Sequence, residues 1–320
     1  MVLCLAALPG CYYMQAAKGQ WELTRKRQPI EDVLASEDTS PELAARLQLV
    51  QEARQFAIDE LGLPDNDTYR TYADIEREYV VWNVFAAPEF SVQPKTWCFP
   101  IVGCVSYRGY FAREDAEREA GRLAEQGYDV AVGGVAAYST LGKLRDPVLS
   151  SMMNWDDVQL VGVLFHELAH QLLYVRDDTA FNESFATAVE EFGVLRWLQS
   201  RGLQAATDEY LARRLVRQDL MSLVAIARDD LEAIYAADTH SDGKRAAKSA
   251  RLATLRQDGA ARLREAGRDP DYWLGRELNN ARLVTMTLYE GRLPEFRALL
   301  ESCGGDIECF YEEARRLAGR

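Results

Sequence analysis

Two histidines and a glutamate within one short segment have the residue types and the spacing to bind a metal ion and move a proton. Residues 164–171 read LFHELAHQ and contain the pattern HExxH, in which His166 and His170 are four residues apart. Side chains at this spacing on a helix lie on one face, with Cβ atoms about 5–6 Å apart, so both imidazoles can reach a single ion. Glu167 is then placed to accept a proton from water on the metal. The alternative is a pair of helix histidines satisfied by ordinary hydrogen bonds.

A catalytic zinc ion needs a third protein ligand and an open position for water. The longer pattern HExxHxxGxxH is excluded, because Leu173 and Arg176 occupy the places of its Gly and its third His. His240, the remaining histidine, lies in the polar sequence DTHSDG, which is typical of a solvated loop. The sequence therefore predicts a carboxylate as the third ligand.

Glu183 is the expected third ligand. The Asp- and Thr-rich residues 177–179 indicate a turn, with Asn182 as a helix N-cap and Glu183 in the first turn of a second helix antiparallel to the first. Glu190, seven residues further on the same face, is a reserve ligand or a hydrogen-bond partner of a histidine. The alternative for Glu183 is a carboxylate that is merely stabilised by the helix dipole.

The segment HELAHQ, followed by FNESFA at 181–186, resembles the glutamate-type zincins (gluzincins). More closely, the chain resembles a bacterial family of zinc aminopeptidases that are carried as envelope lipoproteins. The likeness extends to Cys11 near the start, to residues 138–142 (YSTLG) and to residues 279–281 (NNA). The spacing to Glu183 is shorter than in the best-known gluzincins.

This resemblance implies a single Zn²⁺ ion held by His166, His170 and Glu183, with Glu167 as the general base. It also implies an aminopeptidase acting on a peptide or protein substrate, and such an enzyme needs an acidic group for the free amine of that substrate. Glu190 and Glu191 are candidates for this group. Two alternatives remain open: a zinc endopeptidase of envelope proteins, and a metal-binding envelope lipoprotein without catalytic activity.

Residues 1–11 form a short apolar run that ends in Gly10-Cys11, like the tail of a bacterial lipoprotein signal. Pro9 departs from that pattern, and a positively charged segment in front of the run is missing. We expect a signal remnant with lipidation at Cys11, and therefore a periplasm-facing lipoprotein, in the outer rather than the inner membrane. The alternatives are a true start further upstream or a frayed N-terminus.

The four remaining cysteines after Cys11 fall into two local pairs, Cys98 with Cys104 and Cys303 with Cys309. In an exported protein such pairs are most simply two disulfides. A four-thiolate zinc site is disfavoured, because it usually spaces its ligands two to four residues apart. In a cytosolic protein these residues would be free thiols.

Composition and charge narrow the class of protein. The chain is 48% hydrophobic and 27% charged, which is ordinary for a globular protein, and 320 residues are enough to bury a real core. The net charge of −13 argues against nucleic acid as a partner, since phosphate binding requires clustered Lys and Arg. No segment approaches the roughly 18 apolar residues of a transmembrane helix.

Hydrophobic periodicity predicts the elements that position the motif. Residues 12–40 are polar and are expected to tether or line the body. We predict a helix over 41–63, strands over 69–72, 79–86 and 99–107, a helix over 114–126, and strands over 128–132 and 135–140 around a turn at Gly133-Gly134. Residues 134–139 are expected to form an edge strand that binds substrate through its backbone. An ordinary sheet strand is the alternative.

After residue 199 the sequence is nearly all helical, with periodic segments at 210–236, 245–266, 272–289 and 294–300. Tyr289 is one candidate for a donor to the oxyanion of the reaction, although a packing role is simpler. Together these patterns predict a helix-rich, zincin-like α+β fold, with a small mixed sheet in the N-terminal half packed on the active-site helix. They divide the chain into a signal remnant (1–11), an N-terminal segment (12–40), a catalytic part (41–200) and a helical part (201–320).

Overall fold

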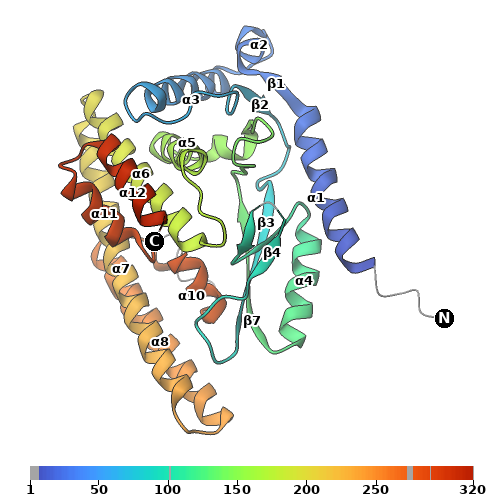
Figure 1. The fold of residues 1–320 in the computed structure, drawn as a ribbon, viewed down its shortest axis with the longest axis vertical. Coiled ribbons are helices and arrows are strands. Elements are labelled where there is room, and N and C mark those ends of the chain that lie inside the picture. Colours follow the sequence, from blue (N-terminus) through green and yellow to red (C-terminus); the bar gives the residue numbers. More distant parts are fainter. Residues whose placement is uncertain (1–6, 101, 272–276, 289, 320) are drawn as a thin grey trace.

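The structure is a computed structural model that describes residues 7–100, 102–271, 277–288 and 290–319. Three small sheets lie in the N-terminal half, and helices make up the C-terminal half (Figure 1). The sheets are mixed, since one of their strand pairs is parallel and the others are antiparallel. The prediction of a helix-rich α+β fold is confirmed.

Residues 12–40 line the body of the protein. They form most of helix α1 (Ala7–Lys26), strand β1 (Arg27–Pro29) and helix α2 (Ile30–Ala35). Strand β1 pairs with β2 (Thr71–Ala73), which in turn pairs in parallel with β8 (Val148–Leu149). The apolar side chains of this segment that face inward are buried in the main core: Leu23, Ile30 and Val33.

The central sheet has the strand order β6–β3–β7, formed by Arg108–Tyr110, Val81–Pro88 and Tyr128–Val135. Strand β7 therefore lies at an edge. The predicted turn at Gly133-Gly134 is wrong, because both glycines stay in β7 and pair with β3. The strand predicted over 135–140 is also absent: only Val135 belongs to β7, and the backbone beyond it is irregular.

Helix α4 (Arg113–Glu125) packs on one face of this sheet, and α10 (Asn280–Thr287) packs on the other. The strand predicted over 99–107 is instead a short hairpin of β4 (Trp97–Phe99) and β5 (Gly103–Val105). A disulfide between Cys98 and Cys104 joins its two strands.

Two antiparallel helices cross the middle of the molecule. The short 3₁₀ helix η1 (Ser150–Asn154) leads into α5 (Asp157–Leu172). Asp156 and Gln159 form a capping box at the N-terminus of α5. Helix α3 (Pro41–Asp59), with Ser40 as its N-cap, packs against α5. After a short turn the chain returns as α6 (Thr179–Ser200).

The N-cap of α6 is Asp178, so the prediction of Asn182 as the N-cap is wrong. Asn182 lies inside the helix, where its side-chain amide accepts from the backbone N–H of Val175 and donates to the carbonyl of the same residue, both at 2.7 Å. It therefore fastens the turn between α5 and α6. Glu183 belongs to the second turn of α6, one residue deeper than Asn182.

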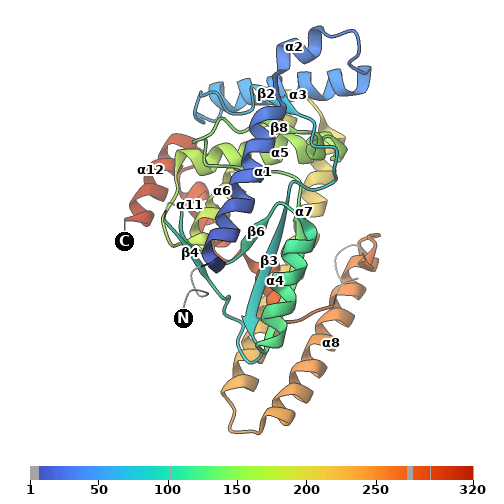
Figure 2. The same ribbon diagram turned by 90° about the vertical axis from the view of Figure 1, so that its right-hand side faces the viewer.

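The C-terminal half consists of a long hairpin of α7 (Gln204–Ala236) and α8 (Ser241–Glu265), followed by α10, α11 (Leu293–Ser302) and α12 (Ile307–Ala318) (Figure 2). Of the helix predicted over 272–289, the structure shows α10, while residues 272–276 and Tyr289 lie outside the described residues. No helix among the described residues is both long and apolar enough to span a bilayer.

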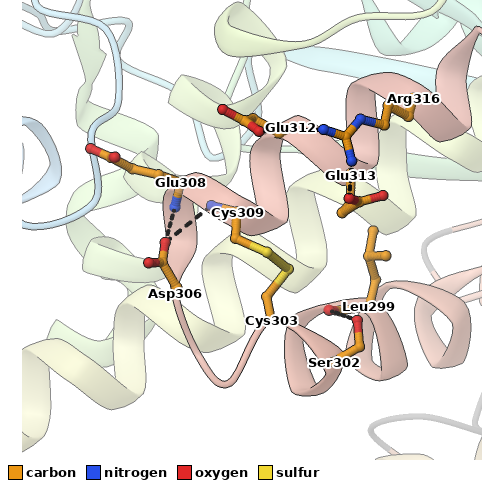
Figure 3. Close-up of a disulfide and its surroundings, with 9 residues drawn as sticks. All are labelled: Leu299, Ser302, Cys303, Asp306, Glu308, Cys309, Glu312, Glu313 and Arg316. Carbon is orange, nitrogen blue, oxygen red and sulfur yellow. Dashed lines mark hydrogen bonds and ion pairs between the residues drawn. A yellow bond between two sulfur atoms is a disulfide. The ribbon is translucent and has the colours of Figure 1, made fainter.

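The second disulfide joins Cys303, at the end of α11, to Cys309 in the first turns of α12 (Figure 3). Asp306 caps α12 by accepting hydrogen bonds from the backbone N–H groups of Glu308 and Cys309. Both predicted cysteine pairs therefore form disulfides. Cys11 lies in α1, and its side chain is outside what the structure describes.

Candidate metal centre

Helices α5 and α6 bring His166, His170 and Glu183 together. All three side chains are buried, and one donor atom of each lies within 4.8 Å of the others. The two Nε2 atoms are 3.2 Å apart, and the Glu183 Oε2 atom lies 3.3 Å from Nε2 of His166 and 3.7 Å from Nε2 of His170. A tetrahedral ion with bonds of about 2.0–2.1 Å separates its ligand atoms by about 3.3 Å. The three donors therefore fit one Zn²⁺-sized cation.

Glu190 holds the other side of the first imidazole. Its Oε2 atom lies 3.1 Å from Nδ1 of His166, while Nε2 of the same ring faces Glu183. Gly162, one helical turn before His166, leaves room for Glu190, since a Cβ atom there would lie 3.1 Å from Glu190 Oε1, closer than an ordinary contact. Of the two roles predicted for Glu190, the structure shows the hydrogen-bond partner of a histidine, which fixes the ring orientation.

The electrostatics of the cluster favour a positive charge at its centre. Burial alone would lower the pKa of His166, but the carboxylates of Glu183 and Glu190 outweigh it and raise this pKa to about 10. Burial would raise the pKa of Glu183, but hydrogen bonds from both imidazoles lower it to about 2. A divalent cation can take the place of the proton that the carboxylates stabilise here.

Glu167 does not belong to the cluster of His166, His170 and Glu183. It lines the same cavity as the two histidines, and burial raises its pKa while the charges of His170 and His166 act in the opposite direction. A carboxylate in this position faces whatever molecule enters the cavity. This placement suits the proton acceptor that the sequence predicted.

The cluster opens into a cavity of about 870 Å³. One wall is apolar and comes from α1 and the β4–β5 hairpin, with Tyr12, Phe99 and Val105. A second part of the wall comes from α7 and carries Arg213 and Arg217. A cavity of this size accommodates a small ligand or several residues of a peptide.

The edge of the sheet forms a third wall. Residues 134–139, predicted to bind a substrate backbone, all line the cavity: the first two belong to β7 and the rest continue it irregularly. Buried Asp146 holds this continuation, because its carboxylate accepts hydrogen bonds from the backbone N–H and the hydroxyl of Thr140, at 2.7 and 2.6 Å, and from the hydroxyl of Ser139 at 3.2 Å.

Glu190 and Glu191, the two carboxylates predicted to bind a substrate amine, have different surroundings in the structure. Glu191 is engaged by Arg297 through two hydrogen bonds of 2.9 and 2.5 Å and by Arg214 at 3.3 Å. Glu190 contacts His166 with one oxygen, and its side chain is about one-third exposed. Glu190 is therefore the better placed of the two.

Tyr107 is a cavity residue that the sequence did not single out. Burial raises the pKa of its hydroxyl well above the ordinary value, and the nearby carboxylates of Glu183 and Glu167 act in the same direction. Tyr107 lies between β5 and β6, and its ring packs against Phe85 of β3. Its position next to the cluster therefore depends on packing between segments far apart in the sequence. Tyr289, the tyrosine named from sequence, lies outside the described residues.

A known protein family matches the chain over most of its length. Neither a curated protein nor a solved structure is significantly similar to the chain. The family described as "Putative aminopeptidase" matches residues 11–320, which include α5, α6 and every side chain of the cluster. The chain therefore belongs to this family.

Proposed function

We propose that the protein is a metal-dependent peptidase, most simply a zinc aminopeptidase of the zincin type. The observation that carries this proposal is the convergence of two Nε2 atoms and one carboxylate oxygen beside Glu167, on the wall of a cavity bordered by a sheet edge. The family description supports hydrolysis of peptides. The choice of Zn²⁺ rests on the donor set of two imidazoles and one carboxylate.

When bound, Zn²⁺ would supply a Lewis acid that polarises a peptide carbonyl and lowers the pKa of water to about 7. Glu167 accepts the proton of the attacking water and passes it to the leaving amine. Glu190 keeps the ring of His166 in one orientation throughout. The backbone of residues 134–139 aligns the peptide by strand-like hydrogen bonds.

An aminopeptidase also has to hold the free amine of its substrate, and Glu190 is the side chain that we assign to this task. Endopeptidase activity is the second candidate. Among the described residues, the only carboxylates that line the cavity are Glu167, Glu183, Glu190 and Glu191, and three of these contact a histidine or an arginine. Cleavage within a peptide chain needs no carboxylate to bind a free amine. The engagement of three of these four carboxylates by other side chains therefore favours endopeptidase activity.

We further propose that the protein is a lipoprotein of the bacterial envelope, anchored through Cys11. Two disulfides support an oxidising compartment, because cytosolic thiols are kept reduced. Mass analysis of the N-terminal peptide from native membranes tests the anchor: an acylated Cys11 is expected. An unmodified Cys11 in a protein released without detergent would contradict it.

The test of the activity compares the metal-loaded wild type with Glu167→Gln on libraries of free and N-acetylated peptides. We expect one equivalent of metal in both proteins and a loss of about 10²–10⁴-fold in kcat for the variant. Cleavage confined to free N-termini identifies the aminopeptidase, and cleavage of acetylated peptides identifies the endopeptidase. Bound metal without hydrolysis of any peptide would sink the proposal and leave a metal-binding protein.

A further inference from the structure

One face of helix α1 packs closely on the body of the protein. Leu23 is buried in the main core, and a Cβ atom built on Gly19 would lie 2.1 Å from the ring of Phe111, so a glycine is needed for the helix to come this near. The Gln15 side chain accepts a hydrogen bond from the backbone N–H of Phe111 at 3.1 Å. These contacts fix how α1 is rotated about its own axis.

The same face of α1 contributes to the cavity of the metal centre. Tyr12 and Ala16 belong to the lining of this cavity. They precede Gly19 and Leu23 at spacings of three or four residues, so all four lie on one side of the helix. The guanidinium carbon of Arg108 lies 4.0 Å from the centre of the Tyr12 ring. The position of α1 therefore sets one wall of the cavity.

The opposite face of α1 is exposed, apolar and basic. Met14 and Trp21 are seven residues apart and are 69% and 68% exposed, and Tyr13 is 49% exposed. Lys18 and Arg25 are exposed on the same stripe, since they follow Met14 and Trp21 by four residues. Figures 1 and 2 show α1 on the outside of the molecule. What we call the outer face of α1 consists of the exposed residues Tyr13, Met14, Ala17, Lys18, Trp21 and Arg25.

The outer face of α1 is positively charged, although the whole chain has a net charge of −13. The side chains of Lys18 and Arg25 form no ion pair or hydrogen bond with any of the described residues. Glu22, the one acidic residue of the segment 12–26, pairs with Arg77 at 2.6 Å. The two cations are therefore available to an anionic partner, and the exposed apolar side chains between them mark an interaction surface.

The composition of this face matches a membrane surface. Trp and Tyr are enriched where a bilayer meets water, and Lys and Arg are attracted to anionic headgroups. Cys11, where we propose the lipid anchor, is three residues before Met14 in the same helix. An acyl group on Cys11 brings this end of α1 to the bilayer, and with it the outer face. The charge and the neighbouring anchor therefore favour a bilayer over a partner protein as the occupant.

We propose that the outer face of α1 binds the surface of an anionic bilayer. Its apolar side chains enter the boundary between headgroups and acyl chains, and Lys18 and Arg25 extend to the headgroup phosphates. This inference goes beyond the proposed peptidase activity and adds an orientation to the proposed anchor. Because Tyr12 and Ala16 on the opposite side of α1 line the metal cavity, the helix fixes the orientation of that cavity relative to the membrane.

Helix α7 provides a control with similar exposure but opposite charge. Ile226 is 55% exposed, and the residues one turn further along, Asp229 and Asp230, are exposed and acidic. An anionic bilayer repels such a surface. Substitution of Ile226 should therefore leave vesicle binding unchanged.

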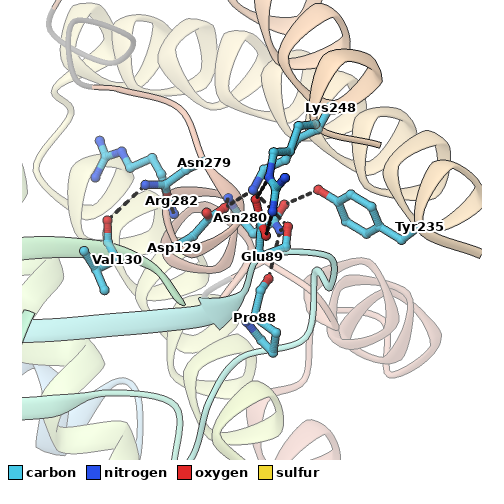
Figure 4. Close-up of polar contacts among 10 residues, drawn as sticks. Pro88, Glu89, Asp129, Val130, Tyr235, Lys248, Asn279, Asn280 and Arg282 are labelled. Atoms are coloured by element: carbon cyan, nitrogen blue, oxygen red, sulfur yellow. Dashed lines mark hydrogen bonds and ion pairs between the residues drawn. The ribbon is translucent and has the colours of Figure 1, made fainter. Parts of the chain in front are cut away.

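This control belongs to the same folded body, because residues 279–281 fasten α7 and α8 to the central sheet (Figure 4). Asn280 of α10 accepts a hydrogen bond from the hydroxyl of Tyr235 in α7 at 2.8 Å, and its backbone N–H donates to Asp129 of β7 at 2.8 Å. Asp129 also pairs with Lys248 of α8 at 2.6 Å. A change on α7 and a change on α1 are thus compared within one folded unit.

The experiment measures binding of the full chain to vesicles of phosphatidylglycerol and phosphatidylcholine, with Cys11→Ser so that no acyl group contributes. Trp21→Gln should weaken binding about tenfold, because it removes an aromatic side chain from the interface. Lys18→Gln should weaken it about fivefold on these vesicles and much less on pure phosphatidylcholine. Ile226→Gln should have no effect.

A fluorescent reporter locates the contact. Ala17→Cys carries an environment-sensitive dye on the outer face, in a chain in which Cys4 and Cys11 are replaced by serine and the other four cysteines form disulfides. Vesicles should shift the emission of this dye to the blue. The same dye on Ile226→Cys should show no shift.

An absence of binding to the anionic vesicles, or binding without a shift at residue 17, would overturn the proposal. A dimer in solution that Trp21→Gln dissociates would also overturn it, since a second copy of the chain would then cover this face. The measurement requires neither acylation of Cys11 nor peptidase activity. Its failure is therefore distinct from a failure of the proposed function.

Discussion

The carboxylate of Glu190 lies 3.1 Å from Nδ1 of His166, on the side of the imidazole that faces away from Glu183. One ring is thus held between two acids of the same helix, seven residues apart. The ring cannot rotate without losing a hydrogen bond at either nitrogen. The packing of α6 against α5 therefore fixes the orientation of the His166 ring. Substitution of either glutamate tests this role.

Glu190→Gln should weaken metal binding without abolishing it. The amide still accepts a hydrogen bond from the imidazole but lacks the charge that raises its basicity, so affinity should fall by about 10–100-fold. Competition with a chelator measures this fall. Glu295→Gln, an exposed change on α11, should leave the affinity unchanged, and equal affinities for all three proteins would contradict the role of Glu190.

Glu183→Gln should remove the stabilisation that the metal gives to the folded state. In the wild type, metal at 100 times its Kd should stabilise the protein by about 2.7 kcal/mol, because the ion binds the folded chain. Thermal unfolding with and without Zn²⁺ measures this as a shift in Tm. An equal shift in Glu183→Gln would show that the carboxylate is not a ligand.

Opening the disulfide of the β4–β5 hairpin should impair substrate binding more than metal binding. The hairpin lines the cavity, and two hydrogen bonds fasten it to the turn after α5. The Cys104 N–H donates to Asp177 Oδ1 at 2.6 Å, and the Tyr174 hydroxyl donates to the Val102 carbonyl at 3.1 Å. The double variant of Cys98 and Cys104 to serine should raise KM several-fold at unchanged metal content.

The second disulfide provides a matched control for this prediction. Both bridges close loops of the same sequence separation, 6, so opening either one releases a similar chain entropy, about 2 kcal/mol. Cys303 and Cys309 lie on α11 and α12, outside the lining of the cavity. Steady-state kinetics should show no change in KM for their double serine variant, and an equal rise in both variants would indicate a general loss of stability.

Two glycines in helix interiors should respond in opposite directions to alanine. A Cβ on Gly193 of α6 would lie 2.7 Å from atoms of Leu61 and Phe165, both fully buried, so Gly193→Ala should destabilise by about 1–3 kcal/mol. A Cβ on Gly121 of α4 meets nothing within 4 Å, so Gly121→Ala should stabilise by up to about 1 kcal/mol. Urea unfolding measures both changes.

The cluster of His166, His170 and Glu183 was predictable because its geometry is local. His166 and His170 share one helix face, and the turn at 177–179 returns the chain antiparallel within a few residues. The exact start of α6 was not predictable, because Asp177, Asp178 and Asn182 all suit a cap. The structure selects Asp178, since Asn182 is needed to fasten the turn.

The sheet was predicted less well, because pairing across the chain overrides local signals. Gly133-Gly134 has turn chemistry, yet β3 offers a continuous row of partners as far as Val81, and the glycines remain extended. Tyr107 could not be placed for the same reason. Its neighbours are set by long-range packing, as in its ring contact with Phe85 of β3, and such packing leaves no period in the sequence.

The side chains of His170, Glu183 and Glu190, which contact His166, all come from the single stretch Asp157–Ser200, with 24 residues as the longest separation. Short loops close quickly, so this helical hairpin can assemble ahead of the long-range strand pairing. An ion bound by this cluster would then act as a folding template as well as a catalytic group. We expect added metal to accelerate refolding from denaturant by stabilising the α5–α6 hairpin before the strands of the sheet pair.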